Sequence, residues 1–95
     1  MDAKQAITTA KSYVAEVFSD EQPKNIGLEE VRFDEAQNAW LITVGFSRSW
    51  DAARPFQTAL GPELDLNRTY KVVRIADRDG AVVSVTNRTF EIAGA

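Results

Sequence analysis

The chain has 95 residues, with 11 lysines or arginines and 14 aspartates or glutamates, so its formal net charge is -3. Histidine and cysteine are both absent, which excludes Ser-His and Cys-His catalytic pairs, a thiolate nucleophile, a Cys/His zinc site and a disulfide. The length predicts one domain over 1–95, and the acidic balance disfavours nucleic-acid binding. No apolar run approaches the roughly 18 residues of a membrane span. With no recognisable signal peptide at its start, the sequence predicts a cytoplasmic protein without a membrane partner.

Residues 3–18 have the pattern of an amphipathic helix. Apolar side chains recur at the i, i+3, i+4 and i+7 spacing from Ala3 to Phe18, with polar side chains between them. Asp2 is suited to cap the start of this helix, and Pro23 follows shortly after its end. Because the helix has a single apolar stripe, we expect it to pack on one other layer.

Two strands are predicted to follow as a hairpin. The first covers Ile26–Phe33, and the second covers Trp40–Ser47, where large apolar residues alternate with other residues at a period of two. The polar segment Asp34–Ala39 connects them. We expect the strand face that carries Val31 and Phe33 to continue the apolar face of the second strand.

A second hairpin is predicted near the C-terminus, with strands over about Tyr70–Ala76 and Ala81–Asn87. Two turn lengths are possible around Asp79 and Gly80. A two-residue turn formed by Asp79 and Gly80 would pair Ile75 with Ser84. A three-residue loop that starts one residue earlier, with Gly80 in the left-handed conformation, keeps the β-branched residues of both strands on one face, so we favour it. The expected cross-strand pairs are Ile75–Val83 and Val73–Val85.

The segment between the hairpins, at about 48–68, does not alternate and is predicted to be an irregular insertion. Within it, Pro55–Gly61 has proline at the first position and glycine at the end, as in a short helical turn. The predicted fold is therefore α+β: one long N-terminal helix packed on one face of a four-stranded antiparallel sheet, in the order α-β-β-(short helix)-β-β.

This order of elements resembles PepSY-type domains, in which an alanine-rich helix is followed by antiparallel strands and a closing hairpin. The helix here contains several alanines, and the closing hairpin contains Tyr70-Lys71-Val72 and the run from Asp77 to Val82. The overlap covers most of the chain, although the 48–68 insertion has no counterpart. The resemblance implies a non-catalytic binding or inhibitory module, with a peptidase as one kind of target.

The insertion contains residue types that are common in protein-binding surfaces. Trp50 and Phe56 lie there, close in sequence to Arg48 and Arg54, and tryptophan and arginine are enriched in binding hot spots. These four residues are the candidate partner-binding site. The alternative is that Trp50 and Phe56 close one end of the hydrophobic core.

Tyr70 and Arg74 are candidate contacts for an anion or another small ligand, with Glu30 as a further polar contact. Arginine binds carboxylate and phosphate groups through its planar guanidinium. We expect Arg74 to project from the sheet face opposite Val73 and Ile75. The alternative is that the basic residues of this hairpin form a solvated face.

The remaining charged motifs are expected to be structural. The Asp77-x-Asp79-Gly80 run lacks the further ligands of a calcium loop and is typical of a hairpin turn. We interpret the acidic residues of the first hairpin as solvated charge that discourages strand pairing between molecules. The sequence thus predicts no metal site and no cofactor. These acidic residues are Glu29, Glu30, Asp34 and Glu35.

The sheet face away from the helix is expected to mix apolar and hydroxyl side chains, and no second long helix is predicted to cover it. A homodimer through this face is one expectation, and coverage by the 48–68 insertion is the other. The residues expected on this face are Leu41, Thr43, Tyr70, Val72, Val82, Ser84 and Thr86.

Two functions fit these features. The first is a small non-catalytic protein-interaction module, such as an inhibitor, an immunity-type protein or an adaptor, with a protein partner that the sequence does not identify. The alternative is a small-molecule-binding domain or minor enzyme, whose ligand would lie between the sheet and the 48–68 segment.

Overall fold

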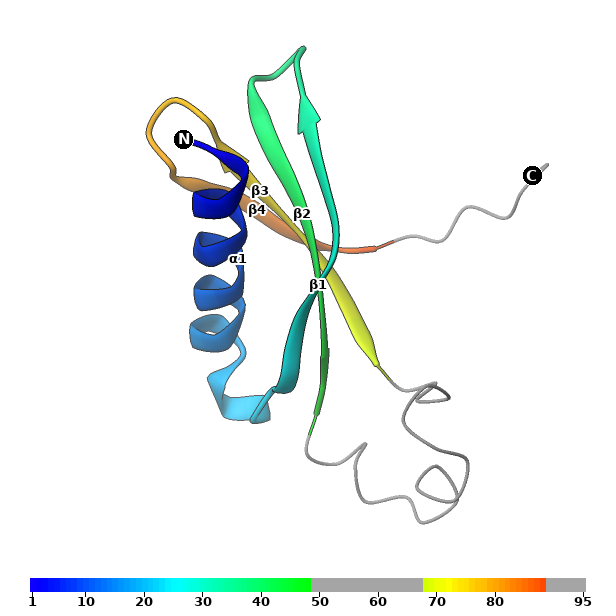
Figure 1. Ribbon diagram of the computed structural model, residues 1–95. Coiled ribbons are helices and arrows are strands. Elements are labelled where there is room, and N and C mark those ends of the chain that lie inside the picture. The colour runs from blue at the N-terminus through cyan, green and yellow to red at the C-terminus, as the bar shows by residue number, and fades with distance from the viewer. Residues whose placement is uncertain (49–67, 89–95) are drawn as a thin grey trace, which may run out of the picture.

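The computed structural model describes residues 1–48 and 68–88. One helix and four antiparallel strands confirm the α+β class (Figure 1). The short helix predicted at Pro55–Gly61 lies outside the described residues. In the described part of the chain, no helix has both the length and the apolar character that crossing a membrane requires. The elements are α1 (Ala3–Val17), the 3-10 turn η1 (Ser19–Glu21), β1 (Lys24–Asp34), β2 (Ala39–Ser47), β3 (Thr69–Ala76) and β4 (Val82–Asn87).

The helix begins where the sequence predicts. The Asp2 carboxylate accepts a hydrogen bond from the Gln5 backbone N–H at 2.8 Å, and the Gln5 side-chain oxygen accepts one from the Asp2 backbone N–H at 2.8 Å. This reciprocal capping box satisfies two N–H groups that have no partner inside the helix. The helix ends at Val17, one residue before the predicted end, and Phe18 closes its last turn.

The strands form a sheet in the order β1-β2-β3-β4, so β1 and β4 are its edges. The helix packs on one face of the sheet (Figure 1), and we call the opposite face the far face. Small residues on α1 allow a close approach to the two central strands, which supply the strand half of the core. The fully buried core residues are Ala6, Ala10, Val14, Ile42, Val44, Phe46, Val73 and Ile75.

The first hairpin has the predicted faces. Phe33 pairs with Trp40 and Val31 with Ile42, so these residues share the helix side of the sheet. β1 starts at Lys24, earlier than predicted, and its pairing is irregular in two places, between Lys24 and Gly27 and between Leu28 and Glu30. These irregularities interrupt the period of two, which explains why the alternation did not reveal the first residues of the strand.

The second hairpin differs from its predicted register at one end. Gly80 has the predicted left-handed conformation, with φ of 73°, and Val73 pairs with Val85 as expected. Ile75, however, pairs with Val82, and the expected Ile75–Val83 pair is wrong.

A β-bulge is the reason for this correction. The register shifts between Arg74 and Ile75, so β4 carries one extra residue there. Val83 is left 60% exposed, whereas Val82 packs against the core. Val82 therefore lies on the helix side of the sheet and does not belong to the far face where it was predicted.

Candidate functional site

The predicted partner-binding residues fall mostly in the insertion. Trp50, Arg54 and Phe56 lie outside the described residues. Arg48 lies just after β2, where its Nε forms an ion pair with Glu21 of η1. Its guanidinium carbon is also 5.7 Å from the centroid of the Phe46 ring. Arg48 thus links the end of β2 to the turn after α1, and its role in partner binding stays a prediction.

The two predicted ligand contacts share the far face. Tyr70 pairs with Gly45 and Arg74 pairs with Leu41. Residues that pair directly across a sheet project to the same side, and alternate residues along a strand do so as well. The same rule places Glu30 on the far face. The three residues chosen from the sequence therefore share one face, although Tyr70 and Arg74 are four residues apart on β3 and Glu30 lies two strands away on β1.

Arg74 is held by the turn of the first hairpin. Its Nη1 lies 3.6 Å from a carboxylate oxygen of Asp34 and donates a hydrogen bond to the side-chain oxygen of Gln37. A guanidinium has five N–H donors. Both contacts use Nη1 and hold the guanidinium in place. The other N–H groups of Arg74 stay available to donate to a ligand.

A second arginine on the far face, Arg68, was not singled out from the sequence. Its Nη2 donates a hydrogen bond to the Gly45 carbonyl at 3.0 Å, and its Nε lies 3.6 Å from a carboxylate oxygen of Glu29. A Cβ at Gly45 would lie 3.0 Å from Arg68, Glu29 and Tyr70 atoms. These three side chains therefore pack directly against the backbone of Gly45. A glycine inside a strand often marks such a close approach.

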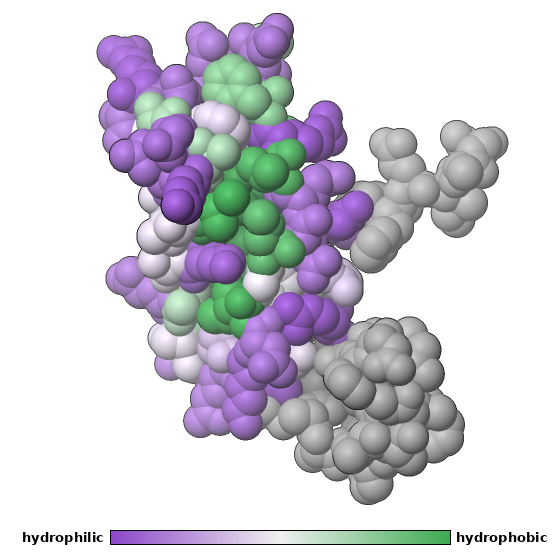
Figure 2. Space-filling view, viewed as in Figure 1, coloured by the Kyte–Doolittle hydropathy of each residue, from purple (hydrophilic) through white to green (hydrophobic). Residues whose placement is uncertain are grey.

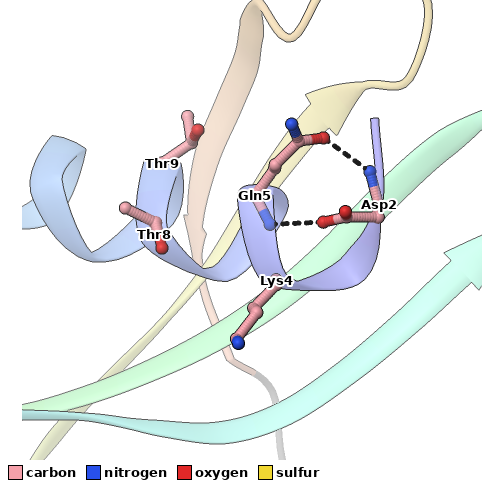
Figure 3. A pocket seen from close by; sticks show the side chains of 5 residues that line it. All are labelled: Asp2, Lys4, Gln5, Thr8 and Thr9. Atoms are coloured by element: carbon pink, nitrogen blue, oxygen red, sulfur yellow. Dashed lines mark hydrogen bonds between the residues drawn. The ribbon is translucent and has the colours of Figure 1, made fainter.

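A shallow depression of about 430 Å³ lies at the start of α1. Figure 3 shows that its lining residues come from the N-cap and the first turns of this one helix, with Asp2 and Gln5 hydrogen-bonded to each other in the capping box. A small-molecule site usually has walls from several elements. We therefore regard this depression as a consequence of the helix cap. It is lined by Asp2, Lys4, Gln5, Thr8 and Thr9.

The most distinctive surface is an apolar strip on β1. Leu28, Val31 and Phe33 are 40%, 39% and 39% exposed, respectively. Their partners on β2 lie on the helix side, and the partners of Leu28 and Val31 are fully buried. Figure 2 shows apolar side chains gathered in a band between α1 and the first hairpin. We call these three residues the β1 strip.

The helix buries side chains of the two central strands more completely than those of the β1 strip. A helix is about 10–12 Å across, whereas neighbouring strands are about 4.8 Å apart, so one helix covers two or three strands. Here the buried stripe of α1 faces a core built from β2 and β3. α1 contacts β1 nearly as extensively as β2 and more than β3, yet Leu28, Val31 and Phe33 on the outer edge of β1 stay partly exposed to water.

The residues between the members of the strip carry charge. Glu30 and Arg32 are both exposed, and their partners on β2 place them on the far face. Within the described part of the chain, neither forms an ion pair. The edge of β1 therefore presents apolar residues on one face and two opposite charges on the other.

Comparison with family models, with curated proteins and with solved structures finds no match to this chain. The resemblance to PepSY-type domains consequently stays a prediction.

Proposed function

We propose that the protein is a small non-catalytic protein-interaction module and that it binds its partner at the β1 edge. The observation that carries this proposal is the β1 strip, which lies on an edge strand of 11 residues. An edge strand has backbone N–H and C=O groups free along one side, and a strand of another protein can pair with them.

Two features support binding over catalysis. A partner strand on β1 would bury the strip together with the free backbone groups, so one contact would satisfy both. The chain also has no histidine and no cysteine, the side chains that most often supply proton transfer or a nucleophile near neutral pH.

Val31→Lys tests the binding edge. A charged lysine at the centre of the strip opposes burial of that edge by a partner. Val83→Lys is the matched control, because Val83 is an exposed valine on the opposite edge strand. We expect the wild type and the Val83→Lys variant to retain the same bound proteins from native lysate, and the Val31→Lys variant to lose them.

Circular dichroism establishes first that all three proteins are folded. Equal capture by the three proteins would contradict a binding role for β1. Loss of capture by the Val83→Lys variant alone would move the binding edge to β4. The predicted contacts of Trp50, Phe56, Arg48 and Arg54 with a partner are a separate prediction, as is the cytoplasmic location.

Small-molecule binding on the far face is the second candidate function. It is favoured by the placement of Tyr70, Arg74 and Glu30 on one face. A ligand that binds only the folded state raises the melting temperature with its concentration. We expect an anionic metabolite that binds there to stabilise the wild type and to lose this effect in Arg74→Gln. A metabolite screen without any shift would contradict this second function.

A further inference from the structure

We infer that the partner at β1 is a second copy of this chain, whose β1 pairs antiparallel with the first about a two-fold axis at Val31. This inference rests on the proposed function. In such a pair, a residue a given number of positions after Val31 in one copy lies opposite the residue the same number of positions before Val31 in the other copy. Val31 then lies opposite Val31 of the second copy, and the two sheets become continuous.

The charges of β1 are complementary in this register. Glu30 lies opposite Arg32 of the second copy, and Arg32 lies opposite Glu30 of the second copy. The symmetry therefore creates two identical ion pairs from side chains that form none within the described part of the chain. Opposite charges that face each other across two strands stabilise the pairing.

The same charges disfavour the neighbouring registers. A shift of the axis by one residue in either direction places Glu30 opposite Glu30 or Arg32 opposite Arg32. Like charges that face each other across strands are destabilising. The acidic residues of β1 thus discourage indiscriminate pairing, as the sequence suggests, and Arg32 permits pairing in one register.

The apolar side chains also agree with this arrangement. A two-fold axis perpendicular to the sheet keeps both helices on the same face, so the two β1 strips meet between them. Phe33 then approaches Leu28 of the second copy, because the extra residue at the irregularity between Leu28 and Glu30 shifts Leu28 by one place. The apolar surface that each helix leaves exposed is thereby buried against the same surface of the second copy.

The other edge is less suited to such pairing. β4 has only six residues and carries the bulge beside Val83. Short edge strands and bulges are common means by which proteins prevent edge pairing. β1 is longer, and its pairing with β2 is regular from Glu30 to Asp34, which covers the centre of the inferred contact.

Sedimentation velocity over a concentration series tests this inference with charge-reversal variants. Wild type should dimerise. Glu30→Arg and Arg32→Glu should each raise the dissociation constant by about tenfold or more, because two attractive pairs become two repulsive ones. An equimolar mixture of these two variants should recover the dimer, since each then meets opposite charges. The double variant Glu30→Arg/Arg32→Glu should also dimerise like wild type.

Glu16→Arg and Arg78→Glu are the matched controls, because they make the same charge changes on α1 and on the second hairpin turn, both at exposed positions. Both should dimerise like wild type. A wild type that is monomeric throughout would overturn the second copy as partner, while the capture experiment with Val31→Lys would still decide the proposed function. A dimer that ignores both reversals, or a mixture that fails to recover it, would overturn this interface and register.

Discussion

At the scale of single residues, Asp77 connects three segments at one end of the molecule. Its carboxylate accepts a hydrogen bond from the Trp40 indole at 2.9 Å and lies 3.5 Å from the N-terminal ammonium of Met1. Its backbone N–H donates to the Asn38 carbonyl in the turn of the first hairpin at 3.0 Å. Asp77 thus joins the start of the chain and both hairpin turns.

These contacts make a pH-dependent contribution to stability. The Trp40 hydrogen bond lowers the pKa of Asp77 below its usual 3.8, and the N-terminal charge acts in the same direction, against a raising effect of desolvation. A carboxylate whose pKa is lower in the folded state stabilises that state at neutral pH. The contribution is lost as the pH falls below about 4, through the folded-state pKa.

Asp77→Asn removes this contribution. We expect the urea midpoint of the wild type to fall more steeply than that of Asp77→Asn between about pH 4 and about pH 2, as followed by circular dichroism. Trp40→Phe removes the indole donor and should flatten the same part of the profile. If the urea midpoints of all three proteins fell in parallel with pH, the Trp40–Asp77 hydrogen bond would not affect the pKa of Asp77.

At the scale of elements, the strands bring side chains that are distant in sequence into contact around Gly45. Gly45 of β2 faces Arg68, Glu29 and Tyr70 at 3.0 Å from where its Cβ would lie, a tight distance on three sides. At Gly27 of β1 the nearest atom would be an Arg68 nitrogen at 3.4 Å, an ordinary contact. The paired glycines therefore differ in how much space they leave.

Gly45→Ala and Gly27→Ala test this difference. We expect Gly45→Ala to lower the free energy of unfolding by about 1–2 kcal/mol, because the new methyl must displace the cluster. Gly27→Ala should be neutral or slightly stabilising, since alanine restricts the unfolded chain more than glycine does. Urea unfolding measures both, and equal losses would contradict the tight packing at Gly45.

Much of this element structure could be predicted from the sequence. The spacing of apolar residues located α1, and the alternation in β2 gave the faces of the first hairpin. Gly80 and the Val73–Val85 pair fixed most of the second. The bulge beside Val83 was missed, because either valine of the Val82–Val83 pair can face the core and only the packed structure selects one.

The candidate site was harder to predict. Tyr70 and Arg74 were placed on one face correctly, because strand parity alone determines it. The β1 strip was missed, because Leu28, Val31 and Phe33 have the same sequence pattern as core residues. Their exposure depends on the position of β1 at an edge of the sheet. The predicted ratio of one long helix to four strands was the signal that could have found it.

At the scale of the whole molecule, one helix packs on one face of the four-stranded sheet (Figure 1), and apolar side chains at the β1 edge stay partly exposed (Figure 2). The two edges are unequal, since β1 is long and apolar on one side, whereas β4 is short and bulged. This inequality gives the molecule one preferred side for strand pairing, and the charges on β1 select the register.

The role of β1 as a self-pairing edge is tested most directly by residue-resolved amide hydrogen exchange at low and high protein concentration. We expect the β1 amides that do not bond to β2 to become protected at high concentration, while the outer amides of β4 stay unprotected. Val31→Lys should remove that protection. Outer amides on β1 and β4 that exchange equally fast at both concentrations would contradict pairing at β1.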